Sequence, residues 1–220
     1  MPIFDAVIQL PERDGIEYYV FAGGKVAIMH NKTDGYDKLV QSPKNIRSDC
    51  PILSKTGWGS IDAVVPVSGV SSQFYFFHGA HYIRATLDKD LKNTEENIRS
   101  FNDQWKGMTK EGIYTIDAGV PINDDETYFF SGTRYVKYNW TKDKIERGPR
   151  YITSGWIGLK KAGFERVDAM FPSADQKNIW YVFRGDQYVR IKWDASEGDD
   201  SLEAGPFLIA EEFYSFKEWP

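Results

Sequence analysis

The stretch Ile116-Asp117-Ala118-Gly119 decides the fold, because it recurs four times together with a second signature, Phe130-Ser131-Gly132. The other copies of the first signature, an apolar residue before Asp-Ala, are Phe4-Asp5-Ala6-Val7, Ile61-Asp62-Ala63-Val64 and Val167-Asp168-Ala169-Met170. The other copies of the second signature, Phe-x-Gly after aromatic residues, are Phe21-Ala22-Gly23, Phe77-His78-Gly79 and Phe183-Arg184-Gly185. Repetition at intervals of roughly 50 residues is typical of solenoids, propellers and linear arrays.

The composition indicates one folded, strand-rich domain. The 220 residues are 41% hydrophobic and 15% aromatic, and aromatic residues beside β-branched ones favour strands. The net charge of −5 argues against nucleic-acid partners and favours cationic ligands. Because no linker interrupts the repeats, we predict a single domain over residues 1–220. Its units are predicted at about 3–57, 59–112, 114–163 and 165–220.

The third unit shows the strands expected in every unit. Residues 114–118 predict a buried strand, 127–130 a second strand and 134–138 an alternating third strand. Gly132-Thr133 lies between the last two, and a Gly in the first central position suits a type II′ hairpin because that position needs positive φ. A variable segment closes each unit, and we expect a short outer strand and a helical turn there.

Four units of about four strands predict an all-β fold, a four-bladed β-propeller with four strands and a short helical turn per blade. Radial packing hides most sheet edges, which otherwise invite aggregation. Small residues suit the innermost strands, where four blades converge on one axis, and these are Ala6, Ala63, Ala118 and Ala169. A linear array is the alternative, but four similar units without polar caps argue against it.

These motifs resemble the hemopexin-type repeat, which starts with apolar-Asp-Ala and continues with an aromatic run into Phe-x-Gly. That repeat then has a Tyr-aliphatic-Arg/Lys strand and a later Pro-x-x-Ile. The Tyr-containing strands here are Tyr82-Ile83-Arg84, Tyr135-Val136-Lys137 and Tyr188-Val189-Arg190. The first unit departs from the pattern with Val26-Ala27-Ile28, and the second lacks the Pro. The resemblance covers essentially the whole chain.

The cysteine content indicates which group of hemopexin-type proteins this chain resembles. Most hemopexin repeats occur in secreted proteins, whose first and last blades are usually joined by a disulfide. This chain has a single cysteine, Cys50, and no recognisable signal peptide, so we expect a cytosolic protein. It is therefore similar to the legume seed albumin-2 family, stand-alone cytosolic propellers of seed cells. That similarity implies a storage albumin, and some members are described as binding spermine and haem, so it also implies a stress or polyamine-related sensing role.

An axial metal ion is also implied by the resemblance. It would be calcium, or alternatively sodium, held by main-chain oxygens of Asp5, Asp62, Asp117 and Asp168. An anion such as chloride would lie deeper in the channel, near Ala6, Ala63, Ala118 and Ala169. Hard cations prefer oxygen ligands of this kind. The alternative is that each Asp side chain caps its own turn, and the two roles are compatible.

Two small ligands are considered beside the metal. Spermine needs spaced carboxylates and aromatic faces, and we expect it at the channel mouth. Acidic loops are other candidates, with solvation as the alternative interpretation; they are Asp124-Asp125-Glu126, Glu197-Gly198-Asp199-Asp200 and Glu211-Glu212. Haem iron needs a ligand such as His78 or His81, which flank a predicted turn, or His30; exposed turn histidines are the alternative. Haem shared by two chains would couple binding to the formation of a homodimer.

The sequence contains no catalytic signature. Cys50 has no neighbouring histidine, and Gly-x-Ser-x-Gly, phosphate-loop and His-Glu-x-x-His motifs are absent. No apolar run reaches the length of a membrane helix, roughly 20 residues. We therefore predict a non-enzymatic binding protein without membrane or nucleic-acid partners. The alternative function is a protein-interaction propeller that docks a partner through a blade face.

Overall fold

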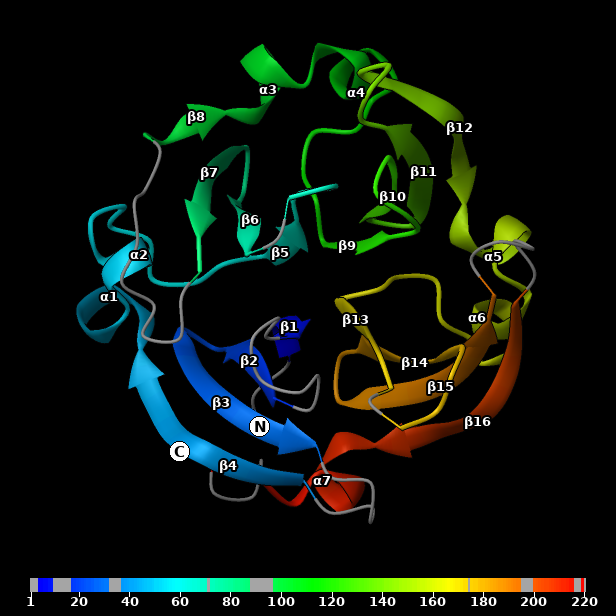
Figure 1. Ribbon diagram of the computed structural model, residues 1–220. Helices are drawn as coiled ribbons and strands as arrows, with labels where there is room; N and C mark the ends of the chain where they lie inside the picture. Colours follow the sequence, from blue (N-terminus) through cyan, green and yellow to red (C-terminus); the bar gives the residue numbers. More distant parts are fainter. Residues whose placement is uncertain are drawn as a thin grey trace.

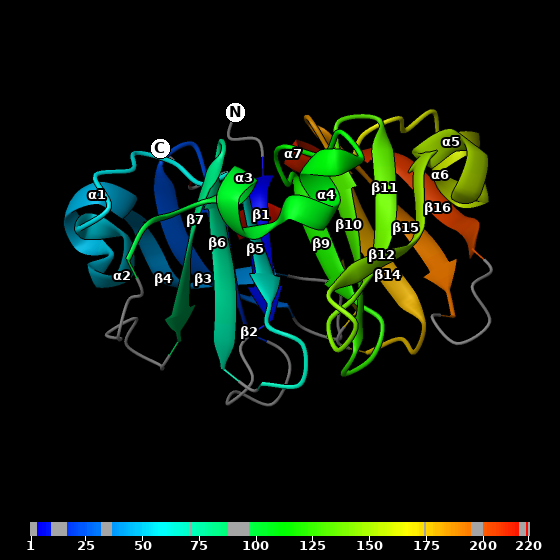
Figure 2. The same ribbon diagram turned by 90° about the horizontal axis from the view of Figure 1, so that it is seen from above.

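The computed structural model describes residues 4–9, 17–31, 37–70, 72–87, 97–173, 175–194, 200–215 and 219. Sixteen strands in these ranges form four antiparallel sheets of four strands each, paired in chain order. Figure 1 shows the sheets arranged in a ring around one axis, and Figure 2 shows the ring from its side. The predicted four-bladed β-propeller is therefore confirmed.

Each blade begins with a strand at the axis and ends with a strand at the rim (Figure 1). The first two blades contain β1 (Phe4–Gln9), β2 (Glu17–Ala22), β3 (Lys25–Asn31), β4 (Asp37–Asn45), β5 (Ala63–Pro66), β6 (Gln73–His78), β7 (His81–Thr86) and β8 (Arg99–Ser100). The last two contain β9 (Ala118–Pro121), β10 (Glu126–Ser131), β11 (Arg134–Asn139), β12 (Lys144–Tyr151), β13 (Ala169–Pro172), β14 (Ile179–Arg184), β15 (Gln187–Trp193) and β16 (Asp200–Leu208).

Short helices follow the outer strand of each blade, as predicted. They are α1 (Ile46–Asp49), α2 (Pro51–Ser54), α3 (Phe101–Gln104), α4 (Lys106–Lys110), α5 (Ile152–Gly155), α6 (Ile157–Lys161) and α7 (Ile209–Glu212). None of the helices in the described ranges has the length and apolar character needed to cross a bilayer.

Two details of the predicted strands are wrong. The strand predicted at 114–118 begins only at Ala118, because Ile116 packs into the core while the Asp117 carboxylate binds the amide of Gly132. The outer strands β4, β12 and β16 have 9, 8 and 9 residues and are not short. Their side chains are mostly half-buried or exposed, so they carry no apolar run that would reveal their length.

The hairpin turns have the positive φ that the sequence predicts. The first central glycines have φ of 55°, 54°, 56° and 59°; they are Gly23, Gly79, Gly132 and Gly185. The first blade differs because Gly24 also has a positive φ, 79°, the pattern of a type I′ turn and not the predicted type II′. A Cβ on Gly24 would lie 2.6 Å from the Gly59 carbonyl oxygen, so the close approach of the next blade also requires glycine there.

The hydrophobic core is divided among the contacts between blades. Four clusters of buried residues each combine side chains of two neighbouring blades. The cluster between the first and last blades contains Phe4, whose ring centroid lies 4.3 Å from that of Phe183 and 6.0 Å from that of Phe213. Because each sheet buries its faces against its neighbours, the hydrophobic stabilisation of every blade depends on a closed ring.

Asp37, at the start of β4 in the first blade, closes the ring by hydrogen bonds to the last blade. Its carboxylate accepts bonds from the Tyr214 amide at 2.7 Å, the Ser215 amide at 2.9 Å and the Ser215 hydroxyl. Asp200 at the start of β16 binds the Ile157 and Gly158 amides in the same way, at 2.9 and 2.5 Å. The first and last blades are therefore joined by the same kind of contact as the third and fourth, an aspartate at the start of an outer strand that accepts bonds from two consecutive backbone amides.

We expect Asp37→Ala to lower the free energy of unfolding by about 2–4 kcal/mol, since it leaves the part-buried Tyr214 amide and the buried amide and hydroxyl of Ser215 without their acceptor. Asp37→Asn keeps one acceptor oxygen and should lose less. Urea unfolding of both variants measures the effect, with Asp103→Ala on α3 as the exposed control. A D37A variant as stable as D103A would contradict a closing role for this carboxylate.

Candidate functional site

Four aspartates meet at the end of the channel where the inner strands begin. Asp62, Asp117 and Asp168 directly precede β5, β9 and β13, and Asp5 lies in β1 at a shift of its register. The inner strands β1, β5, β9 and β13 contact one another around the axis (Figure 1). A narrow cavity of about 10 Å³ is lined by three of these aspartates together with Ala6, Ala63, Ala118 and Ala169. The topology thus brings the predicted axial residues together.

Each aspartate side chain caps the hairpin of its own blade. Its Oδ2 accepts a hydrogen bond from the amide of the first turn glycine; the pairs are Asp5–Gly23 at 2.8 Å and Asp62–Gly79, Asp117–Gly132 and Asp168–Gly185 at 2.6 Å. These bonds give a physical reason why the two sequence signatures always occur together. The capping alternative is therefore the observed role of the carboxylates.

Negative charge accumulates at this end of the channel. Burial raises the pKa of Asp5 to about 6, and repulsion from Asp62 and Asp168 adds to the rise. Burial likewise raises the pKa of Asp117, again with repulsion from Asp168, and Arg166 opposes this rise without cancelling it. The folded protein would therefore be stabilised by a cation placed among these groups.

The main-chain carbonyl oxygens of the aspartates are the atoms that remain available to coordinate such a cation. The amides of Asp62, Asp117 and Asp168 donate to carbonyls of their own blades, at 2.8, 2.9 and 2.9 Å. Within the described ranges, no hydrogen bond is donated to the main-chain oxygens of these three aspartates. The same ranges contain no group of three His, Cys, Asp or Glu side chains able to chelate a metal. The site thus fits a hard cation held by carbonyls and does not fit a side-chain chelate.

The four alanines keep the channel narrow without blocking it. Ala6, Ala63, Ala118 and Ala169 are buried, with 3, 1, 4 and 3% of their surface exposed, and they line the narrow cavity. A cavity of this size has room for about one water molecule or a small ion. Their role beside an anion stays a prediction.

The histidines fall into two separate places. His78 and His81 are cross-strand partners at one hairpin, whereas His30 lies in β3 of another blade. His81 is exposed, while His78 is half-buried with its ring centroid 5.3 Å from that of Trp58. The buried Nδ1 of His78 has no hydrogen-bond partner among the described residues. Haem ligation by any of the three stays a prediction.

The acidic loops mainly support the fold. Asp125 accepts bonds from the Thr141 amide at 2.9 Å and the Asn139 side chain at 2.8 Å, and Asp200 holds α6. Glu211 and Glu212 lie on α7, whereas 197–199 lie outside the described residues. The acidic channel mouth is therefore the stronger candidate for spermine.

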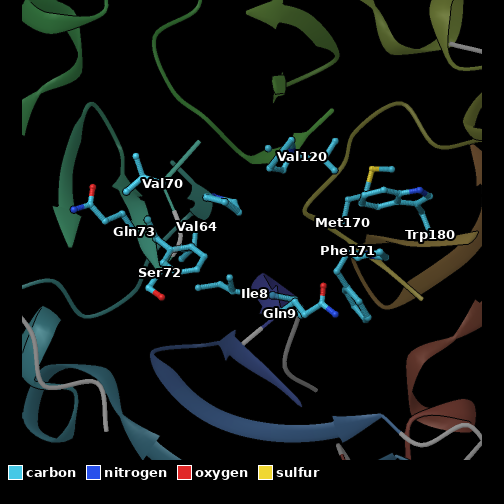
Figure 3. A pocket seen from close by; sticks show the side chains of 16 residues that line it. Ile8, Gln9, Val64, Val70, Ser72, Gln73, Val120, Met170, Phe171 and Trp180 are labelled. Atoms are coloured by element: carbon cyan, nitrogen blue, oxygen red, sulfur yellow. The ribbon is translucent and has the colours of Figure 1, made fainter. Parts of the chain in front are cut away.

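A second cavity at the other end of the axis was missed by the sequence analysis. It has a volume of about 520 Å³, and its lining includes Ile8, Val64, Val120, Met170 and Trp180 (Figure 3). The sequence does contain a signal for an apolar lining at this end of the axis. In the last three inner strands, Asp-Ala is followed by residues without charge and then by a Pro, which is Pro66, Pro121 or Pro172.

The comparisons with known proteins agree with this architecture. The family model for hemopexin matches residues 116–161. Albumin-2 of Pisum sativum is 26% identical over 159 residues, which cover 66% of this chain and 64% of that protein. Albumin-2 of Lathyrus sativus is 26% identical over 140 residues, covering 59% and 60%. The resemblance to legume albumin-2 is confirmed. The matched segments nevertheless span less than two thirds of those relatives.

Solved structures extend the likeness to the whole chain. A 2S albumin seed protein from Dolichos superimposes with a TM-score of 0.86 at 21% identity, covering 99% of this chain and 100% of that one. The hemopexin fold protein CP4 from cow pea gives 0.85 at 21%, covering 99% and 98%. A plant lectin with two metal binding sites from Cicer arietinum gives 0.84 at 20%, covering 97% and 96%. At these identities the likeness establishes the hemopexin fold alone.

We expect Asp5→Asn to stabilise the metal-free protein at about pH 8 by roughly 1 kcal/mol after solvent screening. The folded pKa of about 6 exceeds the ordinary value of 3.8, so the folded state binds more protons than the unfolded state between these values. The free energy of unfolding that the protonated Asp5 supports is therefore fully present below about pH 3.8, and it is lost as the pH rises toward the folded pKa of about 6 and above it. Asn keeps an acceptor for the Gly23 amide, so only the charge is removed.

Urea unfolding with a chelator, followed from about pH 8 to about pH 4, measures this difference, which should shrink toward low pH. Asp103→Asn serves as the exposed control. A D5N variant that is less stable than the wild type at high pH would show that the Asp5 charge is not destabilising.

Proposed function

We propose that this chain is a non-enzymatic, seed-albumin-type propeller that binds a calcium ion on its axis. The observation that carries the proposal is the convergence of four half-buried aspartates on the axis. The main-chain oxygens of Asp62, Asp117 and Asp168 accept no hydrogen bond within the described ranges and are therefore available to a cation. Asp5, Asp62, Asp117 and Asp168 would hold the ion through their main-chain oxygens. The metal binding described for the Cicer arietinum lectin, which shares the fold, supports the proposal.

The ion would have a structural role. It would offset the negative charge of carboxylates such as Asp5 and Asp117, whose pKa burial and then mutual repulsion raise, and it would join all four blades at one point. Calcium suits such a site because it accepts variable oxygen coordination, whereas magnesium demands a near-octahedral set. Sodium is the monovalent alternative, and a chloride beside the channel alanines would complete the arrangement.

Spermine and haem are the small ligands we assign to the same protein. The mutual repulsion of the aspartates at this end of the channel, which Arg166 only partly offsets, favours a polycation there. His81 is the preferred haem ligand, because its side chain is exposed at a hairpin tip. On resemblance to legume albumins, the protein would act in the cytosol of seed cells in storage, with a sensing role if these two ligands compete.

Calcium binding is tested by metal analysis after exhaustive dialysis and by calorimetric titration of the chelator-treated protein. We expect one retained cation and a melting temperature that falls on chelation. Asp117→Asn should weaken calcium binding about tenfold, since it removes one nearby charge but keeps the carbonyl. Asp103→Asn is the matched control. The absence of retained calcium or sodium, with no response of the melting temperature to chelator, would disprove the axial site.

Haem binding is tested by a hemin absorbance titration with and without excess spermine. A saturable Soret shift that spermine reverses and that His81→Ala abolishes is the expected result. The exposed His81 can be replaced without disturbing the core, and His30→Ala provides the control on another blade. A protein that shows no saturable shift in either buffer binds no haem.

A protein-docking role is the second candidate, because apolar side chains are exposed at the rim. Tyr151 at the end of β12 and Ile157 at the start of α6 are 64% and 57% exposed. Such residues suit contact with another protein. This function predicts a stable complex in seed extract that Tyr151→Lys and Ile157→Lys dissociate, while calcium affinity stays unchanged.

A further inference from the structure

The cavity opposite the aspartate end has the size of a small-molecule site. Its volume of about 520 Å³ lies within the usual range for ligand pockets, roughly 300–1,000 Å³. All four blades contribute through their inner strands, and Figure 3 shows Ile8, Val64, Val120 and Met170 around the central space. Val64, Val120 and Met170 are only 5, 2 and 6% exposed, so the walls belong to the packed interior of the ring.

The third inner strand differs from the other three at one position of the lining. Gly119 lines the cavity at the place occupied by Val7, Val64 and Met170 in the other blades. A Cβ on Gly119 would lie 2.6 Å from the Val65 Cγ2 atom and 3.3 Å from the Phe129 ring. Val65 and Phe129 are buried core residues that do not line the cavity, and their packing keeps this position a glycine.

The lining excludes charged ligands. Among the residues that the structure describes, those that line the cavity are aliphatic, aromatic, Met, Pro, Gly, Ser and Gln, and none of them carries a charge. An ammonium or carboxylate group placed there would lose its hydration without gaining an oppositely charged partner among these residues. Spermine and the propionates of haem therefore do not fit this end of the axis, although the aspartate end suits a cation.

The aromatic residues favour a flat ring. The half-buried Trp180 forms one wall, held by Trp193, whose ring centroid is 5.0 Å away, and Phe171 lies nearby (Figure 3). Aromatic faces attract other rings beyond the effect of buried area. Ser72 and Gln73 supply polar groups among the lining residues, enough to orient a ligand with one or two hydrogen-bonding atoms.

We propose that this cavity is a binding site for an uncharged, largely apolar ring compound. It adjoins the narrow cavity of the axial cation site, with which it shares Val7, Val64, Gly119 and Met170, so the protein would carry two ligands of opposite chemistry on one axis. Ligand entry would pass Val70, which lines the cavity and is 45% exposed.

The neutral fluorescent probe N-phenyl-1-naphthylamine tests the proposal on the whole chain. We expect saturable enhancement of its fluorescence at one site per chain, in calcium as well as in chelator, without displacement by spermine. Val70→Trp should weaken binding about tenfold by filling the entrance. Val40→Trp is the matched control, because Val40 is 47% exposed on β4 and does not line the cavity.

Methionine methyl signals locate the probe independently of any blocking variant. The chain has four methionines, and of the three in the described ranges Met170 lines the cavity while Met29 and Met108 are fully buried elsewhere. With ¹³C-methyl labelling, the Met170 signal, assigned through Met170→Leu, should shift on titration while those of Met29 and Met108 remain. Absence of saturable binding, or saturation without a Met170 shift, overturns the proposal.

Discussion

Closure of the ring is the constraint on which the structure depends. No blade has a hydrophobic core of its own, because every buried cluster combines side chains of two neighbours. The interface between the first and last blades must therefore be packed as well as the other three interfaces between neighbouring blades. The tilted and edge-on aromatic rings that pack on Phe4 and the hydrogen bonds of Asp37 provide this interface without a disulfide. The chain's single cysteine, Cys50, is buried and takes part in no disulfide.

The Asp-to-glycine hydrogen bond determines the character of the channel. It uses one carboxylate oxygen per blade to fix the hairpin, and in doing so it gathers four acidic groups near one axis. A few residues after each aspartate, along the inner strands, the same axis is lined by aliphatic and aromatic side chains. The two ends thus differ because of residues that are adjacent in the sequence, and no separate domain is needed for two kinds of ligand.

The sequence predicts those parts of the molecule that repeat. Asp-Ala and Phe-x-Gly recur in every unit, so they predict the blade count, the hairpins and the convergence of Asp5, Asp62, Asp117 and Asp168 on the axis. The start of β9 could not be predicted, since an apolar run around Ile116 looks the same in a strand and in a packed loop. The length of the outer strands could not be predicted for the opposite reason, because their half-exposed residues form no apolar run. The bond from Ser215 to Asp37 crosses 178 positions, whereas the similar bonds from Ile157 and Gly158 to Asp200 cross 43 and 42, so no fixed sequence spacing predicts it.

The position of the Asp37 contact has a consequence for synthesis of the protein. During translation the first blade leaves the ribosome long before Tyr214 and Ser215, and until then the faces of Tyr18 and Phe4 that meet the last blade stay uncovered. Contacts between distant parts of a chain form slowly, and exposed apolar surface invites aggregation. The nascent chain must therefore be protected until its final blade is made, and a chaperone has longest access to the first blade.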